Sequence, residues 1–267
     1  MKLFKYRPEI DGLRTLAILA VLIYHADFSI GKQQLLQGGF LGVDIFFVIS
    51  GFLITSLITK EIDLTGKFSF SNFYERRTRR LLPVLIFVMI LSFPFAWAYL
   101  LPAHFVDFAN SIIASNMFLS NFYWYHSLQV YGAEAGNLKP FLHTWSLSVE
   151  EQYYLFFPII LLAIIRWLKQ HTIATLTILT LSSFQIAEVM SAIDPSLSFY
   201  LLISRFWELL IGSLLAYTLH LHPAKDNDTL LTKTMPSVGL YLILYSIIFV
   251  NLDYNHPGFI TLLPVFG

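Results

Sequence analysis

Hydrophobic residues occur in long runs separated by short polar segments, and this pattern predicts membrane-spanning helices. A spanning helix needs about 20 mostly apolar residues. Seven runs meet this requirement, and an eighth begins near 257 and continues to Gly267, so we expect residues 1–267 to form a C-terminally truncated transmembrane domain. The seven predicted spans are 13–30, 38–59, 81–101, 142–165, 172–190, 199–219 and 236–252.

One further apolar segment, 105–125, does not fit a spanning helix because several Asn and Ser residues interrupt it. Counting it as a span would also move Arg166 and Lys169 to the outer side of the membrane, against the positive-inside rule. We therefore expect a re-entrant or interfacial helix on the outer side. The fold class that follows is all-α, a polytopic transmembrane helix bundle.

The composition agrees with a membrane protein. Hydrophobic residues make up 56% of the chain and charged residues 13%, and the mean hydropathy is +0.65. A soluble domain carries about 25% charged residues, so these values argue against a soluble enzyme and against a disordered chain. The net charge is zero, which gives no basic excess for nucleic acid, and the absence of cysteine excludes disulfides and thiolate nucleophiles. The eight histidines are scattered and indicate no metal site.

Basic residues predict the orientation in the membrane. Fourteen of the 17 Lys and Arg residues fall in 1–14, 60–80, 166–171 and 220–234, which lie on one side if the spans alternate. The positive-inside rule makes this the cytoplasmic side. No small-residue cleavage site follows the first apolar run, so we read a retained helix instead of a signal peptide. We expect a bacterial-type inner (cytoplasmic) membrane protein with its N-terminus in the cytoplasm.

Arg14 and His25 are ionisable residues in or near the first span. Eleven residues correspond to about three helical turns, so the two side chains share a face and lie about 16 Å apart along the axis. Ionisable groups within spans usually line a cavity, and this face would link a cytoplasmic anion-binding position to a titratable group. The alternative is that Arg14 is a snorkelling anchor and His25 a satisfied core histidine.

Asp44 lies early in the second span and needs a partner, which an Arg or a His would supply. The glycines of 38–51 indicate close helix packing, but packing does not explain the aspartate. Arg205 and Glu208 are three residues apart in another span, and we interpret them as a buried, mainly structural salt bridge.

Arg77 and Arg80 are three residues apart and share a helix face where the third span begins. Guanidinium groups suit phosphate, and a helix N-terminus at this place would add positive potential. The cluster could therefore dock a phosphate-rich cytoplasmic cofactor. The alternative is a positive-inside cluster that binds anionic lipid.

Glu150 and Glu151 are adjacent carboxylates at the predicted outer end of a span. Adjacent helical residues point about 100° apart, so they have different roles, and one could face a polar cavity. The alternative is a capping box formed by Ser148 and Glu151, which would leave Glu150 unexplained.

Three long motifs occur together and in order along the chain. They are Arg/Lys-x10-His over 7–25, the glycine-rich stretch 38–54 with the Arg-x-x-Arg element that ends at 80–83, and the stretch 143–154; weaker matches are 204–210 and 256–258. This combination resembles the membrane acyltransferase 3 family. The sequences of its motifs are similar to those of the subgroup that has an additional extracytoplasmic SGNH-type domain.

The resemblance implies an O-acyltransferase that moves an acyl group, usually acetyl, from cytoplasmic acyl-CoA to a hydroxyl of an extracytoplasmic glycan such as lipopolysaccharide O-antigen or peptidoglycan. Acetyl-CoA would be the donor, with a carbohydrate acceptor, surrounding membrane lipid, and no metal or nucleic acid. Carried over by position, Arg77 and Arg80 would bind the CoA phosphates. His25 would be the catalytic histidine, supported by Arg14.

The chemistry of acyl transfer fits these residues. Imidazole titrates near neutral pH, so His25 is the best general base, and Arg14 could offset charge on the thioester oxygen. The candidate catalytic residues are His25, Arg14, Asp44, Glu150 and Glu151, of which Asp44 or Glu150 could orient the base or bind the sugar. The competing function is a transporter in which Arg14, His25, Asp44 and Glu208 form a proton or substrate path.

Overall fold

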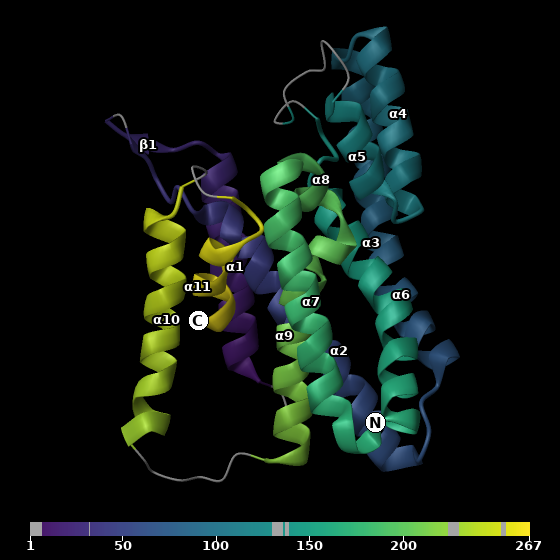
Figure 1. Cartoon of the computed structure of the whole chain (residues 1–267). Coiled ribbons are helices and arrows are strands. Elements are labelled where there is room, and N and C mark those ends of the chain that lie inside the picture. The colour runs from purple at the N-terminus through teal and green to yellow at the C-terminus, as the bar shows by residue number, and fades with distance from the viewer. Residues whose placement is uncertain (1–6, 32, 130–135, 137–138, 224–229, 252–254) are drawn as a thin grey trace. The chain divides into compact units, whose positions relative to one another are not determined.

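The computed structural model describes residues 7–31, 33–129, 136, 139–223, 230–251 and 255–267, and helices dominate it (Figure 1). The α-helices are α1 Pro8–His25, α2 Gly42–Thr65, α3 Phe70–Tyr99, α4 Pro102–Asn116, α5 Ser120–Gln129, α6 Thr144–Trp167, α7 Thr172–Ile193, α8 Pro195–Tyr200, α9 Leu202–Leu221, α10 Leu230–Phe249 and α11 Leu262–Phe266. Short 3-10 helices are η1 Gly39–Leu41, η3 Lys169–His171 and η4 Phe259–Thr261. Within the described chain, the only strands are β1 Ser29–Ile30 and β2 Gln33–Gln34, an antiparallel pair.

The seven predicted spans coincide with α1, α2, α3, α6, α7, α9 and α10, so the prediction of an all-α helix bundle is confirmed. Five described helices are long and apolar enough to cross a membrane, namely α2 with the preceding η1, α3, α6, α7 and α9. The chain is therefore an integral membrane protein. The eighth apolar run begins as expected, with η4 and α11.

The segment 105–125, predicted to be a re-entrant or interfacial helix, is divided into two helices in the structure. α4 ends at Asn116, and α5 begins at Ser120. Between them Phe118 has a φ of 53°, a left-handed conformation that stops an α-helix. The Tyr123 hydroxyl on α5 donates to the carbonyl oxygen of Asp107 on α4 at 3.1 Å, so the two helices are tied together.

The chain divides into two compact units, residues 1–61 with 153–267 and residues 62–152. In the first unit α7 packs along α9, and the two helices lie side by side in Figure 1. The backbones of α2 and α9 also touch. A Cβ at Gly51 would overlap the carbonyl oxygen of Leu209, and a Cβ at Gly212 would overlap that of Val48. Glycine is required at both positions for this close crossing.

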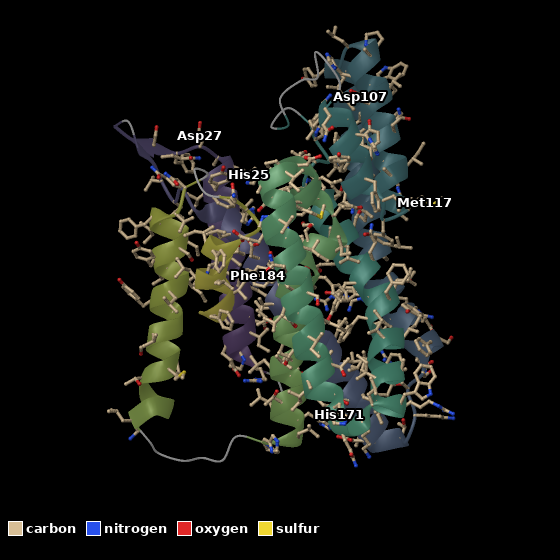
Figure 2. All side chains as sticks on the ribbon, in the orientation of Figure 1. His25, Asp27, Asp107, Met117, His171 and Phe184 are labelled. Carbon is tan, nitrogen blue, oxygen red and sulfur yellow. The ribbon has the colours of Figure 1, made fainter. Side chains whose placement is uncertain are left out.

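Within the first unit, the elements that flank two of the predicted cytoplasmic segments lie at one end. In Figure 2 His25 and Asp27 lie at one end of this unit and His171 lies at the other. The end of α9 and the start of α10, which flank the predicted cytoplasmic segment 220–234, lie at the end of His171 in Figure 1. The elements that flank 166–171 and 220–234 therefore lie at the same end of the first unit, as the alternation of spans predicts.

Candidate functional site

Four ionisable side chains meet in the interior of the first unit. Arg205 Nη1 donates to Asp44 Oδ1 at 2.7 Å and to Glu208 Oε1 at 3.1 Å. His256 Nε2 lies 3.2 Å from each carboxylate oxygen of Asp44. The side chains of Asp44, Arg205 and Glu208 are fully buried, and that of His256 is 8% exposed. We call these four residues the ionic cluster.

The ionic cluster joins three parts of the chain that are remote in sequence. Asp44 comes from the first turn of α2, Arg205 and Glu208 from α9, and His256 from the segment before η4. The predictions that Asp44 has an Arg or His partner and that Arg205 and Glu208 form a buried salt bridge are confirmed. The aromatic face of Phe199 covers the guanidinium of Arg205 at 4.9 Å.

Both ring nitrogens of His256 face charged partners. Arg205 Nη1 lies 3.3 Å from Nε2 and Arg205 Nη2 lies 3.3 Å from Nδ1, while Nε2 also lies 3.2 Å from each carboxylate oxygen of Asp44. Burial lowers the pKa of His256, and this effect outweighs the opposite influence of the Asp44 carboxylate. The imidazole is therefore neutral at neutral pH, and Arg205 is the cation that faces both carboxylates.

One oxygen of the ionic cluster lacks a partner. Glu208 Oε2 is buried and forms no hydrogen bond with the described residues.

No group of three or more His, Asp or Glu side chains in the described ranges is arranged to hold a metal ion.

α1 carries Arg14 and His25 on one uninterrupted helix, as the spacing predicts. Arg14 is half-buried, and its Nε is a buried donor that has no hydrogen-bond acceptor among the described residues. His25 is the last residue of the helix and is exposed, so the alternative of a core histidine is wrong. Its Nδ1 lies 2.9 Å from the carbonyl oxygen of Val21. A carbonyl only accepts, so Nδ1 carries the proton of the neutral imidazole and Nε2 is left as a proton acceptor.

The second unit pairs two predicted site residues, Arg77 and Glu151, that we expected at opposite faces of the membrane; because they are in contact, that expectation is wrong. Arg77 Nε and Nη2 both donate to Glu151 Oε1 at 3.4 Å, and the guanidinium also lies 5.8 Å from the Phe73 ring. Arg80 is exposed. The capping-box alternative for Glu151 is wrong, because α6 already begins at Thr144.

Two further details of the second unit differ from the sequence expectation or add to it. Ser69 caps α3, so this helix begins at Phe70 and Arg77 lies two turns inside it. The expected contribution of a helix N-terminus at Arg77 is wrong, since that effect is confined to the first turn. Ser148 Oγ contacts Ser120 Oγ at 2.7 Å, and Glu150 on α6 is half-buried.

The predicted site residues therefore divide between the units. The first unit contains Arg14, His25 and Asp44, and the second contains Arg77, Arg80, Glu150 and Glu151. Sequence reasoning did not place Arg205 and His256 among the site residues, although they are the partners of Asp44. An arginine within a span and the match at 256–258 were the signals that could have identified them.

The first unit also contains an open groove of about 580 Å³. Side chains of α1, α2, α9, α10 and α11 line it, and nearly all of them are apolar. Arg7 and Glu9, which form a 2.6 Å ion pair, are its charged lining residues. None of the seven predicted site residues lines this groove.

Comparison with known proteins gives consistent matches. A family model described as an acyltransferase domain, that of acyltransferase 3, matches residues 7–267. The O-acetyltransferase OatA of Staphylococcus aureus strain NCTC 8325 is 37% identical over 216 residues, which are 80% of this chain and 35% of OatA. A protein of strain MSSA476 named "Putative O-acetyltransferase" is 43% identical over 169 residues, which are 63% of this chain and 27% of that protein. The chain thus spans about a third of the length of these relatives. No solved structure matches.

Proposed function

The chain belongs to the acyltransferase 3 family, and from this premise we propose that it transfers an acetyl group from acetyl-CoA at the cytoplasmic face to a hydroxyl of an extracytoplasmic glycan. Lipopolysaccharide O-antigen and peptidoglycan are the acceptor classes we propose. The relatives named O-acetyltransferases support the reaction, the apolar helices support a membrane location, and the distribution of Lys and Arg supports a cytoplasmic N-terminus. The observation that carries the proposal is the pair on α1, which consists of a buried Arg14 donor with no acceptor among the described residues and the exposed imidazole of His25.

His25 is the proposed general base. The hydrogen bond from Nδ1 to Val21 fixes the tautomer in which Nε2 has a free lone pair, as a base requires. Nε2 takes the proton of the acceptor hydroxyl, and the hydroxyl oxygen attacks the thioester carbonyl. The C–S bond breaks, the CoA thiolate takes the proton from the imidazolium, and the acetyl ester and CoA leave.

Arg14 is proposed to bind an anionic part of the donor. Because α1 is uninterrupted, eleven residues place Arg14 about 16 Å along the axis from His25, so one carbonyl cannot contact both. The buried Nε needs an acceptor to offset its desolvation. A phosphate of CoA would supply one, and this role fits the end of α1 that we place at the cytoplasm.

Arg77 and Arg80 of the second unit are proposed to bind CoA phosphates. The two Arg77 bonds to Glu151 are long, at 3.4 Å each, so a phosphate could replace them at low cost. Glu151 would then orient Arg77. The adjacent, half-buried Glu150 is proposed to support the same donor site.

Asp44 is proposed to support the site through the ionic cluster. Its carboxylate is fully buried and contacts Arg205 and His256, so it does not reach a substrate directly. The same observation weighs against the transporter, in which Asp44 and Glu208 would exchange protons along an accessible path.

The test is acetylation of the cell envelope by the full-length protein. We expect expression of the wild type to raise the base-labile acetate of the envelope glycans, and His25→Gln to abolish this increase at equal protein level. His171→Gln is the matched control, since this exposed histidine lies at the opposite end of the first unit (Figure 2). Normal acetylation by His25→Gln would refute the proposed base. Solute flux without any acetylated product would favour the transporter.

A further inference from the structure

A row of aromatic rings connects His25 with the ionic cluster. The centroid of the His25 ring lies 5.3 Å from that of Tyr24, Tyr24 lies 5.6 Å from Phe40, and Phe40 lies 5.0 Å from His256. The interplanar angles are 83°, 62° and 83°, so all three contacts are edge-to-face. This geometry is directional, and the orientation of each ring therefore constrains its neighbour.

The segment that carries Phe40 also contacts α1 through its backbone. A Cβ at Gly39 would overlap the carbonyl oxygen of Ala20, and a Cβ at Gly42 would lie 2.5 Å from the carbonyl oxygen of Ala17. The two glycines let η1 and the start of α2 touch α1 directly. The second half of α1 is therefore held by backbone contact next to the ring of Phe40.

The end of α1 depends on these contacts. His25 is the terminal residue, its side chain is exposed, and its hydrogen bond to Val21 lies within its own helix. Helix ends fray unless tertiary contacts hold them. Gln34 Nε2 donates to the carbonyl oxygen of Tyr24 at 2.9 Å, and Phe40 packs on the Tyr24 ring. The orientation of the His25 imidazole thus depends on the contacts that Tyr24 makes with Gln34 and Phe40.

The other end of the row is fixed. His256 is hydrogen-bonded to Asp44 and contacts Arg205, and both partners are fully buried. Phe199 also contacts the imidazole, at 5.9 Å between centroids. Phe40 is itself 9% exposed and packs with Leu41 and Val250, so it has a rigid contact on either side.

We propose that Phe40 and His256 are positioning residues that fix the imidazole of His25 through Tyr24. The inference rests on the proposed function, in which His25 accepts the proton of the acceptor hydroxyl. A misplacement of about 1 Å in a catalytic group can cost about 100-fold in rate. Phe40 and His256 contact no reacting atom in this scheme and act only through the two residues at the end of α1.

The position of His25 can be measured without reference to activity. We expect the full chain, labelled with 13C and 15N in its eight histidines and placed in lipid nanodiscs, to give separate imidazole signals. His25→Gln and His256→Gln assign two of them. Phe40→Leu should shift both signals, because it removes the ring that lies between them. Phe184→Leu is the matched control in the same unit, since Phe184 contacts Trp207 and Phe259 instead.

The consequence for the reaction is measured in inside-out membrane vesicles supplied with [14C]acetyl-CoA, whose own envelope glycans are the acceptors. We expect Phe40→Leu to lower kcat by about 10–100-fold and to change KM for acetyl-CoA by less than about twofold. Phe40→Tyr keeps the ring and should restore both the signals and kcat. A loss of folding alone would lower the amount of active enzyme and would also move the other histidine signals toward the shifts of an unfolded chain.

Unchanged His25 signals in Phe40→Leu, or an equal shift in Phe184→Leu, would overturn the positioning proposal and leave the proposed function intact. Full acetyl transfer by His25→Gln would overturn the proposed role of His25 as the base, and with it the reason for positioning this imidazole, whereas no acetyl transfer by the wild type would overturn the proposed function. The two failures are therefore distinguished by separate variants and separate measurements.

Discussion

Replacing Arg205 by methionine is the most direct test of the ionic cluster. Arg205→Met keeps an unbranched apolar chain of similar reach but removes the cation that contacts both Asp44 and Glu208. All three side chains are fully buried, so water cannot replace the lost charge. His256 is neutral, because burial lowers its pKa, and it does not compensate. The variant therefore leaves two carboxylates facing each other without a counter-ion.

The expected cost can be estimated from buried ion pairs in general. Removing one partner of a buried pair destabilises a protein by about 3–5 kcal/mol. Arg205 serves two carboxylates and also donates to the carbonyl oxygen of Phe199, so we expect the upper half of this range. One kcal/mol shifts Tm by about 2–4 °C in a chain of about this size, which gives a decrease of about 8–20 °C.

The assay is thermal unfolding of the full chain in nanodiscs, followed by tryptophan fluorescence. Trp207 is fully buried two residues from Arg205 and reports on this part of α9. Arg79→Met is the matched control, because Arg79 forms a 2.8 Å ion pair with Glu75 but its side chain is 79% exposed. An exposed pair of this kind contributes less than about 0.5 kcal/mol, so Tm should hardly change.

A second variant separates charge from packing. Arg205→Met combined with Asp44→Asn and Glu208→Gln leaves no uncompensated charge, so it should recover most of the lost Tm. Our reasoning is refuted if Arg205→Met unfolds at the same temperature as the Arg79→Met control. It is also refuted if the triple variant is no more stable than the single one.

Three further predictions test other parts of the structure. Gly212→Ala should prevent stable folding, because its Cβ would overlap the carbonyl oxygen of Val48. Gly12→Ala is the control, since no atom lies within 4 Å of the added Cβ, and it should raise Tm slightly. Fluorescence-detected gel filtration after heating to a series of temperatures compares the folded fraction of the two variants. Burial lowers the pKa of His256 in the folded protein, so as pH drops the unfolded state binds this proton at a higher pH than the folded state. The free energy of unfolding should therefore decrease below about pH 6.5, by at most about 1.4 kcal/mol per pH unit. His256→Gln removes this group and should show a flatter Tm-against-pH curve. Arg77→Met should weaken acetyl-CoA binding by about 10–100-fold in equilibrium dialysis if a charged hydrogen bond is lost, and unchanged affinity would favour a lipid-binding role.

The spanning helices could be predicted from the sequence because hydropathy is a local signal. The predicted span 172–190 corresponds to Thr172–Ile193, and each of the other six overlaps one helix, although several ends differ by four residues or more. The helix break at Phe118 was not predictable, because a left-handed phenylalanine has no sequence pattern of its own. The start of α3 was also missed, since charged residues continue this helix beyond the apolar run, back to Phe70.

The partners of buried charges were predictable by type but not by identity. Asp44 required a cation or an imidazole, yet Arg205 and His256 lie 161 and 212 residues away in the chain. Only tertiary packing brings them together. In the same way, the local Ser148–Glu151 spacing matched a cap, whereas α6 begins a turn earlier and each side chain has a partner from another helix.

The stretch from Gly39 to Asp44 explains why these features occur together in one motif. Its glycines bring the backbone against α1, its phenylalanine contacts Tyr24 and His256, and its aspartate joins α9. Burying these charges contributes little to net stability, since desolvation offsets much of the attraction. The desolvation cost of these buried charges is better explained by a role in positioning His25, because an exposed base at a helix end needs rigid support from residues that do not react. The same six residues would then serve packing and catalysis at once, and loss of any one contact should disturb His25 before it unfolds the bundle.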